Sequence, residues 1–441
     1  MTPMLEAFLP TIAGFAILLF LLALRMPIGL SLIAVAFFGI ALETNLRAAI
    51  GSVARLPYEL ATNWSFSAVP MFLLMGFIAS ESGLTRGLFS ATRILLARLP
   101  GNLACASVLA SALFAAASGS SVATASAMAR IAIPEMLRRG YDQGLASGSV
   151  AAAGTLGSLI PPSILMVLYG VYADVSIGAL FLAGVLPGIL SVIIYLGMIV
   201  IRCIKDPALA GQGGGAEPEE RPPLWVVLRD ITPLPLLAAI VMGSISFGLA
   251  TPTEAGALGA LGAIVISALM GTFRLPLFLS ALRQTAITFA SIFIIVIGGA
   301  LLTRFVAVAG LNTALSDLFA DSVLGPIGLI ILVSILYIIL GMFIDSIGLL
   351  LLTAPLILPM ANAAGVDLIW FGIILIKLLE IGLITPPVGL NIFVIQSTMK
   401  GAIPMPVIFR GVGWFIAMDL LTLVILVAFP AITLWLPSLM N

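Results

Sequence analysis

Two stretches of this chain carry a Pro-Pro pair in the middle of an apolar segment: GSLIPPSILMVL, from Gly157 to Leu168, and GLITPPVGLNIF, from Gly382 to Phe393. Each proline removes a backbone donor and interrupts the hydrogen-bond ladder of a helix. Inside a membrane, such non-helical backbone is tolerated only where it is buried in protein or lines a cavity. The two stretches therefore predict two broken helices that face an interior site.

The chain repeats itself along its length. The two Pro-Pro stretches are separated by 382 − 157 = 225 residues, and prolines elsewhere keep the same offset. This offset indicates an internal duplication, with a first repeat over 1–204, a linker over 205–223 and a second repeat over 224–441. The linker is the one stretch in which glycine, proline and charge replace the apolar pattern. The matched prolines are Pro27, Pro134, Pro161 and Pro162, which correspond to Pro252, Pro359, Pro386 and Pro387.

Composition places most of the chain in lipid. The 441 residues are 61% hydrophobic and 9% charged, whereas a soluble domain has about 25% charged residues. Apolar stretches of about 20 residues, enough to cross a bilayer, recur throughout. We therefore expect an all-α polytopic membrane protein. A net charge of zero without a basic block argues against nucleic acid as a partner.

Two regions, 101–139 and 323–361, are too long for one span and have small or polar residues at their centres. These centres are SGSS, at Ser118–Ser121, and IDS, at Ile344–Ser346. Each region predicts a re-entrant helical hairpin whose two ends lie on one side of the membrane.

The order of these segments predicts an inverted-topology repeat. With a broken helix at about 143–172 and another at about 367–398, each half has five full crossings and one hairpin. Because five is odd, the second half runs opposite to the first. Placing the linker inside also places most lysines and arginines at cytoplasmic ends. Only Arg47 and Arg55 fall outside, in a segment whose helical spacing of apolar residues predicts an interfacial helix, and both chain ends are then periplasmic.

The hairpin tips offer oxygen ligands suited to sodium. Asp345 and Ser346 supply a carboxylate and a hydroxyl, and the first tip supplies only hydroxyls; hard oxygen ligands do not favour a soft transition metal. Close helix packing is an equally good interpretation of the serines alone. A carboxylate deep in a bilayer costs about 2.5–3.5 kcal/mol, so Asp345 needs a function or a partner, unless the tip reaches the outer interface. The hydroxyls of the first tip belong to Ser118, Ser120, Ser121 and Thr124.

The remaining intramembrane charges point less clearly to a site. Lys377 and Glu380 are three residues apart on one helix, where they can neutralise each other or contact substrate. Arg304 stands in an apolar span, as a snorkelling side chain or as an anion contact. Histidine is absent, and Cys105 and Cys203 lack metal-ligand spacing and leave the redox compartment open. Without a phosphate-binding loop or a Ser-His-Asp set, we expect a transporter and not an enzyme.

The motifs together resemble a known family. They are SGSSVATASAMARIAIPEMLRRGYDQGLASGSVAAAGTLGSLIPPSILMVLYG from Ser118, FLAGVLPGIL from Phe181, ATPTEAGALGA from Ala250 and LITPPVGLNIFV from Leu383. In this order the chain resembles, over nearly its whole length, the large membrane subunit of tripartite ATP-independent periplasmic (TRAP) transporters. The resemblance implies a secondary transporter of the elevator type, in which hairpins and broken helices move against a scaffold, with sodium as the coupling ion.

The resemblance also implies where ions and substrate bind. One ion site would lie between the first hairpin tip and the first break, and the other between the second tip and the second break, with substrate between the tips. Half-helix N-termini after Pro162 and Pro387 suit a carboxylate group. The implied sodium ligands are Ser118, Gly119, Ser120, Ser121, Gly154, Gly157 and Pro161, then Asp345, Ser346, Gly382, Thr385 and Pro386. The implied substrate contacts are Thr124, Ser158, Ser163, Gly389, Asn391 and Arg304.

By the same resemblance, the partners would be a small four-helix membrane subunit and a periplasmic binding protein that delivers an organic acid, all at a bacterial inner membrane. The alternative is a stand-alone carrier of dicarboxylates, coupled to sodium or to protons, without a binding protein. A channel is disfavoured because the chain has no repeated charged ring or carbonyl filter motif. The sequence leaves open which acid is carried and how many ions accompany it.

Overall fold

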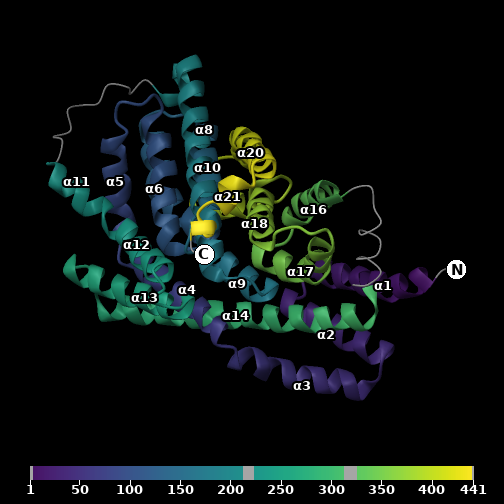
Figure 1. Ribbon diagram of the computed structural model, residues 1–441. Coiled ribbons are helices and arrows are strands. Elements are labelled where there is room, and N and C mark those ends of the chain that lie inside the picture. Colours follow the sequence, from purple (N-terminus) through teal and green to yellow (C-terminus); the bar gives the residue numbers. More distant parts are fainter. Residues whose placement is uncertain (1–2, 212–222, 312–324, 440–441) are drawn as a thin grey trace.

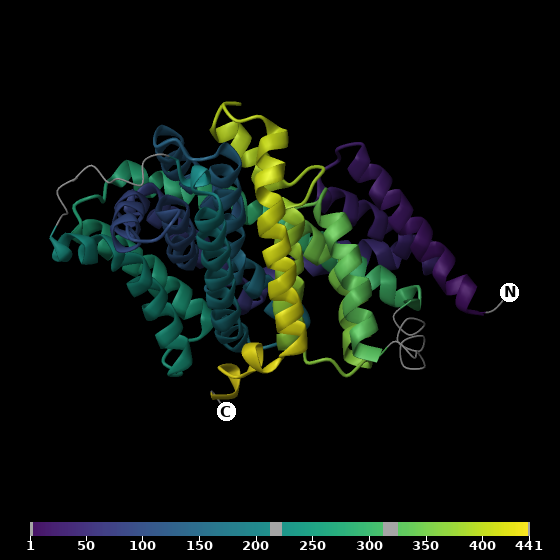
Figure 2. The same ribbon diagram turned by 90° about the horizontal axis from the view of Figure 1, so that it is seen from above.

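The computed structural model describes residues 3–211, 223–311 and 325–439, and within these ranges the chain is helical without strands. The prediction of an all-α membrane protein is confirmed. Figures 1 and 2 show the helices packed side by side around a central group that contains α8, α10, α18 and α20. Most of the predicted linker, and the segment with Asp317 and Asp321 that precedes the second predicted hairpin, lie outside the described residues.

The first half of the chain forms ten α-helices within its described residues. They are α1 (Pro3–Ala23), α2 (Ile28–Glu43), α3 (Leu46–Thr62), α4 (Ala68–Glu81), α5 (Leu84–Leu95), α6 (Asn102–Ser118), α7 (Ser121–Arg138), α8 (Gln143–Leu159), α9 (Ile164–Ala173) and α10 (Ile177–Lys205), with short 3-10 turns at Trp64–Ser67 and Pro207–Ala210.

The second half continues with a similar order. Its described helices are α11 (Leu224–Ile231), α12 (Pro233–Ser246), α13 (Pro252–Leu269), α14 (Leu275–Val308), α16 (Gly325–Gly341), α17 (Ser346–Ala363), α18 (Leu368–Ile384), α19 (Leu390–Thr398), α20 (Met405–Ala428) and α21 (Ala431–Leu434), before a 3-10 turn at Pro437–Leu439.

The helix bounds recur with the offset found in the sequence. Adding 225 to the bounds of α7 gives 346–363, which are the bounds of α17, and adding 225 to those of α8 gives 368–384, which are the bounds of α18. The Pro-Pro breaks behave alike, since both Pro161-Pro162 and Pro386-Pro387 are cis. The repeat is thus visible in local structure, while the opposite membrane orientation of the two halves stays a prediction.

By length and apolar composition, seven helices of the described chain can cross a membrane, or eight if the bent pair α11 and α12 forms one span. Four shorter apolar helices accompany them, including α6 and α16. The interruption of both predicted hairpin regions shortens their first arms to 17 residues each, below the roughly 20 residues that a perpendicular crossing requires.

The two helices that precede the Pro-Pro breaks form the core. Every residue of α8 from Gly144 to Leu159 is buried, and so is every residue of α18 from Trp370 to Ile384. Small residues let α8 approach its neighbours closely: a Cβ on Gly148 would lie 2.6 Å from the carbonyl carbon of Gly411 in α20. This burial places the ends of both helices inside the protein.

One peripheral helix corresponds to the amphipathic segment that was expected at the membrane interface. The amphipathic segment with Arg47 and Arg55 forms α3, which begins after Asn45; the Asn45 side chain accepts a hydrogen bond from the backbone N–H of Ala48 at 2.9 Å. Figure 1 shows α3 lying outside the main bundle.

Candidate functional site

The first interruption brings hydroxyl groups to a tight turn between α6 and α7. Gly119 adopts a positive φ of 59°, which lets α6 end at Ser118 and α7 begin at Ser121. The Ser120 side chain caps α7, accepting from the N–H of Ala123 at 3.4 Å. The Ser118 and Thr124 hydroxyls lie 2.8 Å apart, and Thr124 also donates to the Ser120 carbonyl at 2.9 Å. The turn is therefore held by its own hydroxyls.

The second interruption is built in a similar way between α16 and α17. Asp345 caps α17, and its side chain accepts a hydrogen bond from the N–H of Gly348 at 3.0 Å. Such an N-cap satisfies one of the donors that a helix start leaves free. Ser346 follows as the first residue of α17 and is buried. The carboxylate predicted as a sodium ligand thus has a local structural role as well.

The two turns meet around Glu380 of α18. The Ser121 hydroxyl donates a short hydrogen bond to the Glu380 carboxylate, and the Ser346 hydroxyl lies 3.5 Å from its other oxygen. Ser121 also lies 2.8 Å from the hydroxyl of Ser158 in α8. A pocket of about 100 Å³ is lined by these residues together with Gly119, Ser120 and Asp345. We call it the tip pocket.

The first break packs directly against the first turn. A Cβ on Gly157 would lie 2.7 Å from the Ser120 carbonyl oxygen, and one on Gly154 would lie 2.8 Å from the Cβ of Ala125. The N–H of Ile164, at the start of α9, donates to the Gly119 carbonyl at 3.4 Å. Glycine at these positions is what allows α8 to touch the turn.

Replacing Gly157 with alanine is expected to destabilise the protein by about 1–3 kcal/mol, because the new methyl group would press on main-chain atoms that cannot rotate away. Thermal unfolding in detergent measures this as a lower melting temperature. Gly197→Ala in α10 is the matched control, since a Cβ there meets nothing within 4 Å, and a helical Gly→Ala change gains about 0.5–1 kcal/mol. Equal melting temperatures for the two variants would contradict the packing argument.

The other residues singled out in the sequence do not line the tip pocket. Pro386 is exposed, Thr385 donates to the Ile381 carbonyl at 2.6 Å, and Gly382 packs closely on Gly341 of α16. Asn391 reaches the Ala151 carbonyl at 3.4 Å, and Arg304 is exposed on α14. Further residues outside the pocket lining are Gly154, Gly157, Pro161, Ser163, Gly389, Ser118 and Thr124; of these, Ser163 has a buried hydroxyl without a partner in the described chain.

Lys377 and Glu380 form no ion pair with each other within the described residues, although their spacing on one helix would allow one. The Nζ of Lys377 lies 2.5 Å from the Asp419 carboxylate of α20 and donates to the Ser191 hydroxyl at 3.3 Å. The Tyr195 hydroxyl of α10 donates a short hydrogen bond to the same carboxylate. Lys377 therefore joins α18 to α10 and α20, which leaves Glu380 to the two turns.

Asp419 and Glu380 could have been singled out from the sequence, although the spacing of Lys377 and Glu380 within one helix points to a different pairing. Each is a lone acidic residue in an otherwise apolar helix, and such residues mark functional or paired sites in membranes. Cys105 and Cys203 are buried free cysteines. Within the described residues no cluster of three or more His, Cys, Asp or Glu side chains is placed to bind a metal.

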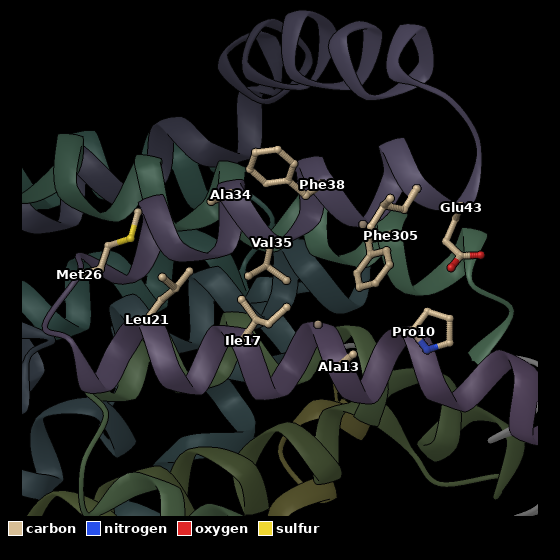
Figure 3. Close-up of a pocket in the computed structure, with 13 residues that line it drawn as sticks. Pro10, Ala13, Ile17, Leu21, Met26, Ala34, Val35, Phe38, Glu43 and Phe305 are labelled. Carbon is tan, nitrogen blue, oxygen red and sulfur yellow. The ribbon is translucent and has the colours of Figure 1, made fainter.

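A second hollow, of a different character, lies between α1 and α2. It has about 470 Å³ and is lined by side chains such as Ile17, Leu21, Val35 and Phe305, with Glu43 at its edge (Figure 3). Apart from Glu43, the described lining is apolar and offers no side-chain oxygen ligands for a hard cation. This hollow fits an apolar occupant, and the tip pocket is the stronger candidate for ion binding.

The helices and the tip pocket define a class: a polytopic helical membrane protein with an oxygen-lined site between two helical turns. Its fold is similar to that of the YdaH transporter of Alcanivorax borkumensis, with a TM-score of 0.57 at 15% sequence identity, over 96% of this chain and 98% of that one. At this identity the similarity concerns the fold alone.

Sequence relatives identify the family. The family model described as "Tripartite ATP-independent periplasmic transporter, DctM component" matches residues 15–432. The chain is 34% identical to the sialic acid TRAP transporter large permease protein SiaM of Vibrio cholerae, over 95% of this chain and 96% of that protein. It is 36% identical to the C4-dicarboxylate TRAP transporter large permease protein DctM of Pseudomonas aeruginosa, over 88% and 90%.

The chain therefore belongs to the DctM family of TRAP transporter large permeases, as the sequence motifs predicted. Its relatives are named as transporter permeases and not as enzymes. Transporters of this family in general also include a small membrane subunit and a binding protein.

Proposed function

We propose that this chain is the sodium-coupled large membrane subunit of an importer for a small organic acid. The observation that carries the proposal is the Glu380 carboxylate, which is reached by a hydroxyl from each of the two turns. A cation in the tip pocket would contact groups from α7, α8, α17 and α18 at once. Its binding would therefore favour a closed arrangement of the two turns.

The chemistry of the pocket supports sodium as the ion. Its polar lining consists of oxygen-bearing groups, namely the Glu380 and Asp345 carboxylates and the hydroxyls of Ser120, Ser121, Ser158 and Ser346. Hard cations prefer oxygen ligands of this kind. A cation bound in this small pocket would be attracted by both acidic groups that line it.

The substrate class and partners in this proposal follow from the family. Relatives are named for sialic acid and C4-dicarboxylates, and both are organic acids. We infer that the chain works in the bacterial inner membrane, with both termini periplasmic, beside a small four-helix subunit, and receives substrate from a periplasmic binding protein. The two turns and the broken helices would move together against the remaining helices, in an elevator-type motion.

The test is uptake of radiolabelled succinate, N-acetylneuraminate and pyruvate into proteoliposomes that hold this chain with its small subunit. Uptake that requires both an inward sodium gradient and the binding protein is the expected result. Full uptake by the chain alone would favour the stand-alone carrier. Uptake driven by a pH gradient, and indifferent to sodium, would replace sodium with protons as the coupling ion.

Asp345→Asn is expected to raise the sodium concentration for half-maximal uptake about tenfold or more, because a ligand to a charged group contributes about 1.5–3 kcal/mol. Asparagine caps helices as well as aspartate does, so this variant removes the charge and retains the cap. Asp367→Asn, at the N-cap of α18, is the matched control. A sodium dependence that is unchanged in both variants would remove Asp345 from the site.

A further inference from the structure

A large polar cavity lies beside the tip pocket, between α7 and the helices α4 and α14. It has a volume of about 520 Å³. Ser120 lines both this cavity and the tip pocket, so the two spaces adjoin at the first turn. The cavity is large enough for a small organic acid, which the tip pocket is not.

Arg130 of α7 brings positive charge to this cavity. It stands nine residues after Ser121, roughly 13 Å along the helix from the turn at a rise of about 1.5 Å per residue. Its side chain is exposed to the space that it lines. In the part of the chain that the structure describes, the Arg130 guanidinium has no ion pair.

Among the described residues that line the cavity, Glu81 is the one acidic side chain, and it is already engaged. Glu81, at the end of α4, accepts a hydrogen bond from the side-chain amide of Gln284 at 2.8 Å. The Gln284 amide is in turn 3.1 Å from the Ser280 hydroxyl. Within the described residues, Arg130 is thus a cation facing a polar cavity in a mostly apolar protein, without a carboxylate bound to it.

Polar residues connect Arg130 with the first turn. Ser126 precedes Arg130 by four residues, so both lie on the same face of α7, and both line the cavity together with Ser120. A planar guanidinium binds a carboxylate through two parallel hydrogen bonds. An acid held by Arg130 would extend along this face toward the turn and the adjoining ion pocket.

We infer that Arg130 is a carboxylate-binding residue, and that the cavity between α7, α4 and α14 is the site through which the organic acid passes. The inference rests on the proposed function and adds the residue that recognises the substrate. It places the acid in the cavity that adjoins the tip pocket at Ser120. Arg304, on the exposed surface of α14, then has no part in binding the acid.

The test removes the positive charge at position 130 by mutation and then restores it with a thiol reagent. In a chain with Cys105 and Cys203 replaced by alanine, Arg130→Cys is expected to raise the KM for a transported acid about tenfold or more. A trimethylammonium-ethyl methanethiosulfonate reagent forms a mixed disulfide with the introduced thiol, releases a sulfinate and returns a positive charge, which should lower the KM again. The sulfonate-bearing reagent of similar size should not lower the KM. Succinate, N-acetylneuraminate and pyruvate serve as probes.

Arg138→Cys is the matched control. Arg138 lies on the same helix, is 75% exposed and pairs with Glu135 outside the cavity. The KM of the Arg138→Cys variant for the transported acid should therefore not change with either reagent. A purely structural role for Arg130 would lower the amount of active protein without altering the KM, and would overturn the inference. So would a Glu81→Gln variant that reproduces the KM change, because Arg130 would then act through Glu81.

Failure of this inference is distinguishable from failure of the proposed function. Sodium dependence is measured first, on the unmodified chain. If uptake proves independent of sodium, the coupling proposal fails, while the effect of charge at position 130 on substrate KM still decides the role of Arg130. If uptake depends on sodium but Arg130→Cys leaves the substrate KM unchanged, only the inference fails.

Discussion

Lys377→Met is expected to lower the stability of the folded protein by about 3–5 kcal/mol, since it leaves the Asp419 carboxylate buried without its cation. The two side chains are 2% and 1% exposed, and their charged atoms lie 2.5 Å apart. The second oxygen of Asp419 has no partner in the described chain. The carboxylate therefore depends on Lys377 and on the Tyr195 hydroxyl.

The double variant Lys377→Met, Asp419→Leu separates the charge effect from packing. Replacing a buried ion pair by apolar side chains of similar size is often neutral or stabilising, so the double variant should recover most of the loss. Thermal and denaturant unfolding in detergent give the comparison. Lys205→Met, at the exposed end of α10, controls for the loss of a lysine and should leave the melting temperature unchanged.

A different result would change the view of this cluster. If the single Lys377→Met variant is as stable as the native chain, the Asp419 carboxylate does not depend on Lys377, and the contact between them contributes little to stability. If the double variant folds but no longer transports, the cluster would have a role beyond joining α18 to α10 and α20.

Local structure was the most predictable part of the molecule. The Pro-Pro pairs fix where α8 and α18 end, and the small and polar residues at Ser118–Ser121 and around Asp345 fix where the hairpin regions turn. These are local effects of missing donors, helix caps and glycine conformation. They depend on few neighbours, which is why the repeat in the sequence reappears as a repeat of helix bounds.

Contacts between side chains of neighbouring helices were the least predictable part. Spacing along a helix shows that Lys377 and Glu380 are near each other, but not that α20 places Asp419 against one of them and α7 places Ser121 against the other. The two turns border one pocket, a contact that helix spacing alone does not show, while the two ion sites expected at the two breaks stay a prediction. Side-chain periodicity shows which residues share a face of a helix, but not which other helix packs against that face.

Glu380→Gln is expected to raise the sodium concentration for half-maximal uptake by on the order of a hundredfold to a thousandfold. Two unit charges about 4 Å apart interact by about 4 kcal/mol at an effective dielectric constant of 20, and each 1.4 kcal/mol is about a factor of ten. Glutamine is close in shape and retains one oxygen, which can accept from the hydroxyl of Ser121 or of Ser346, while its NH2 group faces the other hydroxyl. The variant therefore removes charge with little change in packing.

Two measurements establish whether the charge acts on sodium. Uptake in proteoliposomes gives the sodium dependence, and the rise in melting temperature on replacing potassium chloride by sodium chloride gives binding without transport. Glu254→Gln is the matched control, because Glu254 lies in a capping box at the start of α13 where glutamine also serves. The control should keep both the sodium dependence and the melting shift of the native chain.

The two readouts separate binding from coupling in the tip pocket. Loss of both in Glu380→Gln places the cation at this carboxylate. If sodium still raises the melting temperature while uptake is lost, the ion binds elsewhere, and Glu380 acts by holding the two turns together through Ser121 and Ser346. If neither readout changes, a charge buried between the two turns has no part in sodium binding, and the site must be sought around the second break, where Pro386 and Pro387 are exposed.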